Sequence, residues 1–202
     1  ESQSALNVES NLNGTAILKR RGFSRQASLT YTTAPVNGSF NFTNDNGDRL
    51  DIVCHDRVCS KSTNGGAFTT FLTTAAAGIK RWSFAEVDGD VYLANDKRDP
   101  VGKYDGTTFT SPTGIPAGSI IALSQDRLLV ADTAANPNRI DRSKSGAFTT
   151  FTTGVLSVDA YADDVVRPGD RTTGLRCTDG LCCIFRTNSI TVCEEGDQYT
   201  TR

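Results

Sequence analysis

The chain has 202 residues, of which 37% are hydrophobic and 22% are charged, values that are typical of a globular protein. Its 21 basic and 23 acidic residues give a formal charge of −2, which excludes a general electrostatic attraction to nucleic acids or anionic membranes. No stretch approaches the run of about 18 apolar residues that a transmembrane helix needs, so we expect no membrane span.

The first segment, residues 1–35, precedes the first repeat and is expected to form an extended arm. It holds the densest basic cluster of the chain, Lys19-Arg20-Arg21 followed by Arg25. Such a cluster can contact DNA phosphates without reading the base sequence. We favour the other interpretation, in which the arm packs on a partner protein or a neighbouring subunit.

A short string that occurs twice indicates an internal repeat. Gly-Ala-Phe-Thr-Thr-Phe occupies residues 66–71 and again residues 146–151. Between the two copies, Gly106 begins the similar string Gly-Thr-Thr-Phe. Gly106 lies midway between Gly66 and Gly146, which indicates a unit of roughly 40 residues and about four units in the chain.

Residues that favour tight turns recur inside each unit. Asn46-Gly47, Asp88-Gly89 and Asp179-Gly180 suit the positive φ angles of type I′ hairpin turns. Two further turns follow in each unit, so that four short strands alternate with three turns, as in one blade of a β-propeller. The expected second turns are residues 55–57, 96–100, 135–138 and 187–188, and the third are 64–66, 105–106, 145–146 and 195–196.

These features predict an all-β fold, a β-propeller-like domain over residues 36–202. No window shows sustained helical spacing of apolar residues, so little helix is expected. The alternative is a meander in an ordinary β-sandwich, because regular turn spacing also suits that fold. Propellers commonly have about 4–8 blades, so four units predict a partial or minimal propeller that missing chain or neighbouring subunits complete.

The cysteines are expected to face one another across the predicted hairpins. Buried free thiols are our first interpretation, and cross-strand disulfides are the second. Zinc binding is the third, because the spacing differs from the paired C-x₂₋₄-C pattern of a zinc ribbon. Cys183 is expected on the opposite sheet face from its neighbours. The expected pairs are Cys54 with Cys59, Cys177 with Cys182, and Cys182 with Cys193.

Nothing in the sequence marks a catalytic or metal site. The one histidine, His55, would have to serve any Ser/His/Asp or Cys/His mechanism, and we interpret it as a solvent-exposed turn residue. The carboxylates lack the twelve-residue calcium loop with its terminal Glu. We therefore expect no enzyme, cofactor or metal. The carboxylates in question are Asp88, Asp90, Asp96, Asp99, Asp159, Asp163, Asp164 and Asp170.

Several stretches resemble a known family. They are residues 11–23 (NLNGTAILKRRGF), 124–131 (SQDRLLVA) and 139–143 (RIDRS), and then residues 173–175 leading into 184–190. They are similar to the β-propeller proteins of bacteriophage tails, the hub or nozzle proteins of short-tailed phages. The resemblance implies a virion location, a homo-oligomeric ring, contacts with portal, adaptor or other tail proteins, and a channel through which DNA passes.

We therefore expect a non-enzymatic structural protein of a phage tail. The alternative is an extracellular binding propeller that recognises glycans or a protein partner. Trp82 is the only tryptophan, so a sugar-stacking platform repeated in every blade is missing. A hydrolase that uses carboxylates in the central channel is a third interpretation, but the sequence singles out no pair of them.

Overall fold

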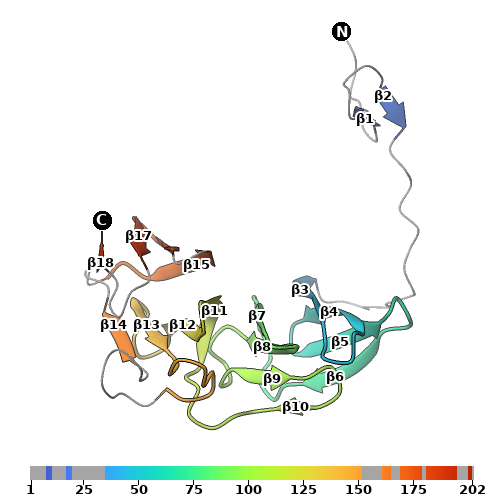
Figure 1. The fold of residues 1–202 in the computed structure, drawn as a ribbon, viewed down its shortest axis with the longest axis horizontal. Helices are drawn as coiled ribbons and strands as arrows, with labels where there is room; N and C mark the ends of the chain where they lie inside the picture. The colour runs from blue at the N-terminus through green and yellow to red at the C-terminus, as the bar shows by residue number, and fades with distance from the viewer. Residues whose placement is uncertain are drawn as a thin grey trace.

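The computed structural model describes residues 8–10, 17–19, 35–151, 161–164, 169–178, 181–194 and 200–201. Within these ranges every regular element is a β-strand. Four four-stranded antiparallel meanders follow one another along the chain, and a short hairpin precedes them (Figure 1). Each meander is one blade of a β-propeller, so the predicted all-β, propeller-like fold is confirmed.

The blades are numbered in chain order. Blade 1 contains β3 (Val36–Thr43), β4 (Arg49–His55), β5 (Val58–Thr63) and β6 (Thr69–Thr73). Blade 2 contains β7 (Ser83–Val87), β8 (Asp90–Ala94), β9 (Gly102–Tyr104) and β10 (Phe109–Thr110). Blade 3 contains β11 (Gly118–Ser124), β12 (Arg127–Thr133), β13 (Arg139–Arg142) and β14 (Tyr161–Asp164). Blade 4 contains β15 (Thr172–Thr178), β16 (Leu181–Arg186), β17 (Ile190–Glu194) and β18 (Thr200–Thr201).

The segment before blade 1 is described only in part. β1 (Val8–Ser10) and β2 (Ile17–Lys19) pair with each other as antiparallel strands. The first strand of blade 1 then begins at Val36. The proposed division into an arm over residues 1–35 and a propeller domain over residues 36–202 stays a prediction. None of the described residues belongs to a helix that could cross a membrane.

The blades stand side by side through their first strands. β3 contacts β7, β7 contacts β11, and β11 contacts β15. The result is an open arc, in which blade 1 and blade 4 lie at opposite ends (Figure 1). The four blades therefore form a partial propeller rather than a closed ring.

Apolar residues fill the space between successive blades. Leu50 and Ile52 of blade 1 pack with Val91 and Leu93 of blade 2, and equivalent clusters lie between blades 2 and 3 and between blades 3 and 4. Side chains alternate between the two faces of a strand, so a blade with a neighbour on each side is buried on both faces. Accordingly β12 in blade 3 is buried along its whole length, whereas burial alternates along β4 and β16 in the two end blades.

The predicted hairpin turns differ in detail. Asp88 and Gly89 both have positive φ angles, 49° and 74°, as a type I′ turn requires. At Asn46-Gly47 only Gly47 has a positive φ, so the expected type I′ geometry is wrong there. Asn44 explains the difference, because its side-chain oxygen accepts hydrogen bonds from the backbone N–H groups of Asn46 and Asp48. Asp179-Gly180 lies outside the described residues.

The two copies of the Gly-Ala-Phe-Thr-Thr-Phe string adopt different structures. The first leads into β6, where Phe71 stacks on Tyr104 with ring centroids 4.0 Å apart. The second folds into turns, and its Phe148 and Phe151 pack on the cluster between blades 2 and 3. The repeat predicted a strand directly after the turn at residues 145–146. This prediction is wrong for blade 3. Its fourth strand is β14, farther along the chain.

Tyr104 makes the first interblade cluster sensitive to alkaline pH. The side chain is fully buried, and its hydroxyl donates a hydrogen bond to the carbonyl oxygen of Gly106 at 2.8 Å. Burial, with a smaller contribution from the charge of Asp105, raises the pKa of Tyr104 from 10.0 to about 12. The folded pKa thus exceeds the unfolded pKa, so this contribution to stability is present below about pH 10 and is lost toward about pH 12.

We expect the urea midpoint of the protein to fall between about pH 10 and about pH 12, and to fall less in a Tyr104→Phe variant. Circular dichroism at a series of pH values measures both slopes. The comparison uses the slope and not the absolute midpoint, because the variant also loses the hydrogen bond to Gly106. Equal slopes for the two proteins would contradict a buried, neutral phenol at this position.

Candidate functional site

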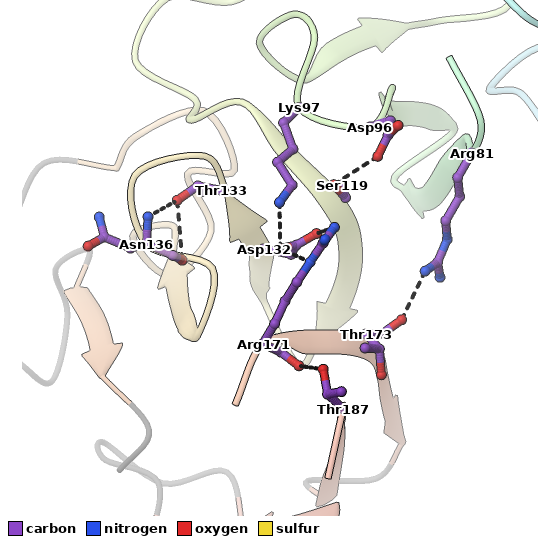
Figure 2. Close-up of polar contacts among 10 residues, drawn as sticks. All are labelled: Arg81, Asp96, Lys97, Ser119, Asp132, Thr133, Asn136, Arg171, Thr173 and Thr187. Carbon is purple, nitrogen blue, oxygen red and sulfur yellow. Dashed lines mark hydrogen bonds and ion pairs between the residues drawn. The ribbon is translucent and has the colours of Figure 1, made fainter. Parts of the chain in front are cut away.

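A pocket of about 280 Å³ lies where blades 2, 3 and 4 meet. Its residues come from β11, from the end of β12 and the start of β15, from the loops after β8 and β16, and from the segments just before β7 and β15 (Figure 2). It gathers more charged and hydroxyl side chains than the apolar clusters beneath it. The lining residues are Arg81, Asp96, Ser119, Ile120, Asp132, Arg171, Thr172, Thr173 and Thr187.

Asp132 is the central residue of this pocket. It lies near the end of β12, and its side chain is only 2% exposed. Lys97, from the loop after β8, places its Nζ 2.6 Å from Asp132 Oδ1. Arg171, just before β15, donates from Nε to Oδ1 at 2.8 Å and from Nη2 to Oδ2 at 2.7 Å. One carboxylate of blade 3 thus binds a cation on the blade 2 side and a cation on the blade 4 side (Figure 2).

The contact has the features of a strong, oriented ion pair. Both oxygens of Asp132 accept charge-assisted hydrogen bonds, and Arg171 uses the planar two-point geometry that matches a carboxylate. The hydrogen bond with Asp132 raises the pKa of Arg171, so its guanidinium remains charged. We name this arrangement, formed by Lys97, Asp132 and Arg171, the Asp132 joint.

Backbone geometry in the joint is unusual. Lys97 and Asp132 have φ angles of 64° and 55°, in the left-handed region. This conformation costs a non-glycine residue roughly 1–2 kcal/mol, so surrounding contacts must hold it. The ion pair is one such contact, and the hydrogen bond from Lys97 N–H to the Gly118 carbonyl oxygen at 3.2 Å is another.

Other polar groups of the pocket also connect different blades. Arg81, just before β7, donates from Nη1 to the backbone carbonyl oxygen of Thr173 in blade 4 at 2.9 Å. Ser119 in blade 3 donates its hydroxyl to Asp96 in the loop of blade 2 at 3.5 Å. The pocket is therefore a meeting point of blades whose polar groups are used in contacts between them (Figure 2).

This arrangement offers little for bond chemistry. Asp132 is bound by two cations, so it acts as a bridging anion rather than as a general base. Within the described residues there is no group of three or more His, Cys, Asp or Glu side chains that could hold a metal ion.

His55 lies away from this pocket, in blade 1. It is the last residue of β4, opposite Val58 and Val36 in the sheet, and it is half-buried. The prediction of a solvent-exposed turn residue is wrong, because the turn begins one residue later and His55 still belongs to the strand.

The predicted cysteine pairs meet across their hairpins. Cys54 and Cys59 are disulfide-bonded, as are Cys177 and Cys182, each with Cα atoms 4.1 Å apart. These four residues are therefore not the free thiols of our first interpretation. The fifth residue of the set, Cys193, is buried and lies opposite Cys182 in the sheet.

Most of the basic cluster of the first segment lies outside the part of the chain that the structure describes. Lys19 ends β2, and Arg20, Arg21 and Arg25 lie outside the described residues. Their predicted contact with a partner or with DNA therefore stays a prediction.

A second cavity, of about 250 Å³, lies beside Trp82 between blades 1 and 2. The tryptophan side chain is only 5% exposed, and its Nε1 donates to the carbonyl oxygen of Asp56 at 2.9 Å. Its ring is part of the apolar cluster and is not presented to solvent, so it does not form an open stacking platform for sugars.

Comparison with known proteins gives a likeness of fold. No family model and no curated protein sequence matches this chain. Among solved structures it is similar to virginiamycin B lyase from Staphylococcus aureus, with a TM-score of 0.58, 15% identity, and coverage of 87% of this chain and 58% of that one. A catalytically inactive variant of that lyase with quinupristin gives a TM-score of 0.57, 13% identity, and coverage of 86% of this chain and 57% of that one.

A computationally designed protein, Ika4, is also similar. Its TM-score is 0.56 at 13% identity, with coverage of 87% of this chain and all of the designed one. At these identities the likeness supports the β-propeller fold and nothing finer. The chain spans just over half the length of the lyase, 58% of it.

Proposed function

We propose that this chain is a non-enzymatic structural protein that forms part of a phage tail. The observation that carries the proposal is the Asp132 joint, in which the polar groups of the pocket hold three blades together. A pocket whose polar groups are used in contacts between blades suits a structural protein better than an enzyme.

A hydrogen bond to a backbone carbonyl oxygen recurs at each junction and supports the same interpretation. At each of the three junctions, the loop after the second strand of one blade hydrogen-bonds the start of the next blade. The contacts are Trp82 Nε1 to Asp56 O at 2.9 Å, Lys97 N to Gly118 O at 3.2 Å, and Thr172 N to Pro137 O at 2.9 Å. Neighbouring blades are thus held at a defined angle by hydrogen bonds as well as by apolar packing.

The fold alone does not decide between an enzyme and a structural protein, because the lyase to which this chain is similar is an enzyme. Support for a non-enzymatic role comes from the pocket. Its central carboxylate is bound by Lys97 and Arg171, and the one histidine of the chain lies in blade 1, whereas the pocket lies among blades 2, 3 and 4.

The tail setting rests on the resemblance of short sequence stretches. Residues 124–131 and 139–143 contribute to β11, β12 and β13, the inner strands of blade 3. These stretches thus belong to the part of the protein that carries Asp132. The expected partners are portal, adaptor or other tail proteins and further copies of this chain.

The proposal is tested on particles purified from a culture that expresses the gene. We expect mass spectrometry to detect the protein in the particles at a constant ratio to the major capsid protein, and immunogold microscopy to place it at one end. An unrelated cytosolic protein of similar abundance serves as the control for carry-over. A protein that is absent from washed particles would contradict the tail assignment.

A further inference from the structure

Three cysteines of blade 4 lie in one row across three neighbouring strands. Cys177 in β15 is directly opposite Cys182 in β16, and Cys182 is directly opposite Cys193 in β17. Directly opposite side chains lie on the same face of a sheet, here the face that packs on blade 3. Cys177 is bonded to Cys182, and Cys193 belongs to neither disulfide. We name these three residues the cysteine row.

Both neighbours of Cys182 lie within bonding range of it. The Cα atoms of Cys177 and Cys182 are 4.1 Å apart, as expected for a narrow pair of an antiparallel sheet. The N–H and C=O groups of a strand residue point to the same side, so a residue in a narrow pair on one side is in a wide pair on the other. Cys182 and Cys193 are therefore about 5.5 Å apart at Cα. Disulfides usually have Cα separations of about 4.4–6.8 Å, so Cys182 can bond to either neighbour.

The row places Cys193 where an attacking thiolate must be. In thiol–disulfide exchange a thiolate attacks one sulfur of a disulfide, and the other sulfur leaves. Because β16 lies between β15 and β17, Cys193 approaches Cys182 from the side opposite Cys177, the leaving sulfur. The Ser124 hydroxyl donates a hydrogen bond to Cys182 Sγ at 3.2 Å, since the bonded sulfur carries no hydrogen, and helps to hold the central sulfur in place. Cys183 lies on the other face of β16 and cannot compete.

The two ends of the row differ in exposure. Cys182 and Cys193 are both 0% exposed, in the cluster between blades 3 and 4. Cys177 is half-buried and lines a pocket of about 370 Å³ that is formed by the first strands of all four blades. A bond between Cys182 and Cys193 would thus be shielded from reagents, and the thiol released by the exchange would be the one nearest to solvent.

The disulfide of blade 1 lacks a third cysteine. Cys54 and Cys59 have the same sequence separation of 5 and the same Cα distance of 4.1 Å as the bonded pair of blade 4. On their other sides, however, Cys54 lies opposite Gly38 and Cys59 lies opposite Leu72. This pair has no neighbouring thiol in its row, so it serves as a control within the same molecule.

We propose that the cysteine row is a thiol–disulfide exchange site that makes Cys177 available for modification. The thiolate of Cys193 attacks Cys182 Sγ, so that the Cys182–Cys193 bond forms and the Cys177–Cys182 bond breaks. Cys193 gives its proton to solvent, and Cys177 leaves as a thiolate that takes up a proton. The numbers of disulfides and thiols do not change, so the step needs no oxidant or reductant. The released thiol then reacts with a thiol-reactive electrophile. The inference goes beyond the proposed function and does not depend on the tail assignment.

Maleimide labelling of the folded protein traps the released thiol. Cys183 is half-buried and belongs to neither disulfide, so it should take the first label. We expect a second label to appear more slowly at Cys177, because maleimide consumes this thiol irreversibly and draws the exchange to completion. The Cys54–Cys59 pair should stay unlabelled.

Tryptic peptide mapping without reduction locates the label and the bond. Trypsin cleaves after arginine, which places three cysteines in residues 177–186 and Cys193 alone in residues 187–202. The fraction of these two peptides that is joined by a disulfide should rise in step with the second label, which should lie on Cys177. Samples are unfolded in acid with excess reagent, because only the thiolate exchanges.

Two serine variants separate the exchange from simple exposure. Cys193→Ser should slow the labelling of Cys177 at least about tenfold, because the attacking sulfur is gone. Cys183→Ser is the matched control, which should remove the first label and leave the second. Circular dichroism checks that both variants are folded, and Cys193→Ala replaces Cys193→Ser if the hydroxyl disturbs the buried cluster.

Three results would overturn the proposal. One is labelling of the wild type that stops at one maleimide per chain. Another is a second label on Cys193 with the Cys177–Cys182 bond intact, which would mean that local opening exposes the buried thiol. The third is an unchanged rate of Cys177 labelling when Cys193 is replaced.

Discussion

Replacing Asp132 with asparagine is expected to lower the free energy of unfolding by about 2–3 kcal/mol. The substitution keeps the size of the side chain but leaves Lys97 and Arg171 without their shared anion at a position that is 2% exposed. Removing one partner of a fully buried pair costs about 3–5 kcal/mol, and we expect less here because Arg171 is 53% exposed and can be solvated. Urea denaturation followed by far-ultraviolet circular dichroism measures the change.

Asp51→Asn provides the matched control. Asp51 also pairs with an arginine, Arg49, but that arginine is 68% exposed and the pair lies at the free face of blade 1. An exposed pair contributes about 0–1 kcal/mol, so this variant should be nearly as stable as the wild type. A cost for Asp132→Asn no larger than that of Asp51→Asn would show that the Asp132 joint does not hold the blades together.

Hydrogen exchange locates the effect of the Asp132 change. The amide of Lys97 in blade 2 donates to the carbonyl oxygen of Gly118 in blade 3. The amide of Thr172 in blade 4 donates to the carbonyl oxygen of Pro137 in blade 3. We expect these two amides to exchange faster in Asp132→Asn. The amide of Ile79, bound to the Asp56 carboxylate at the junction of blades 1 and 2, should keep its protection.

The blade architecture could be predicted because its signals are local. Asp88-Gly89 specifies its turn through the φ angles that only a few residue types tolerate. Counting outward from the turn at Asp56-Arg57 sets Cys54 opposite Cys59, as observed. Whether those sulfurs are bonded does not follow from the register, and the structure shows a disulfide where buried thiols were our first interpretation.

The Asp132 joint could not be predicted in the same way. Its three residues are separated by 35 and 39 positions in the chain and come from three blades, and no spacing rule connects them. The only local signal is that Asp132 directly follows the apolar run of β12. An aspartate at the end of a strand can be exposed to solvent or buried between blades. Only the packing of one blade against the next decides which of the two applies.

Sequence identity also failed to predict identical structure in the repeat. Phe71 and Phe151 occupy the same position of the repeated string. Phe71 stacks on Tyr104 from a strand, whereas Phe151 packs on the blade 2–3 cluster from an irregular segment that follows the turns. The two phenylalanines thus pack on different interblade clusters, from backbone segments of different conformation.

Replacing Trp82 with alanine is expected to have the largest effect on stability, about 3–5 kcal/mol. The side chain is only 5% exposed in the cluster between blades 1 and 2, and its Nε1 donates to the carbonyl oxygen of Asp56 at 2.9 Å. Its Cβ, which alanine keeps, lies close to blade 1, since a methyl group added at Gly38 would lie 2.5 Å from it. The expected loss therefore comes from the indole ring. Trp82→Phe should cost less, because it keeps an aromatic ring and loses mainly the hydrogen bond.

Phe185→Ala serves as the control for the loss of an aromatic side chain. Because Phe185 is 41% exposed, this change should lower the free energy of unfolding by less than about 1 kcal/mol. Similar losses for Trp82→Ala and Phe185→Ala would contradict the role of Trp82 as the anchor between blades 1 and 2. Hydrogen exchange adds the reciprocal test. Trp82→Ala should release the amide of Ile79 and spare that of Thr172, the opposite of the Asp132 variant. Opposite patterns would mean that the junctions open one by one, as expected when each blade is held only by its neighbours.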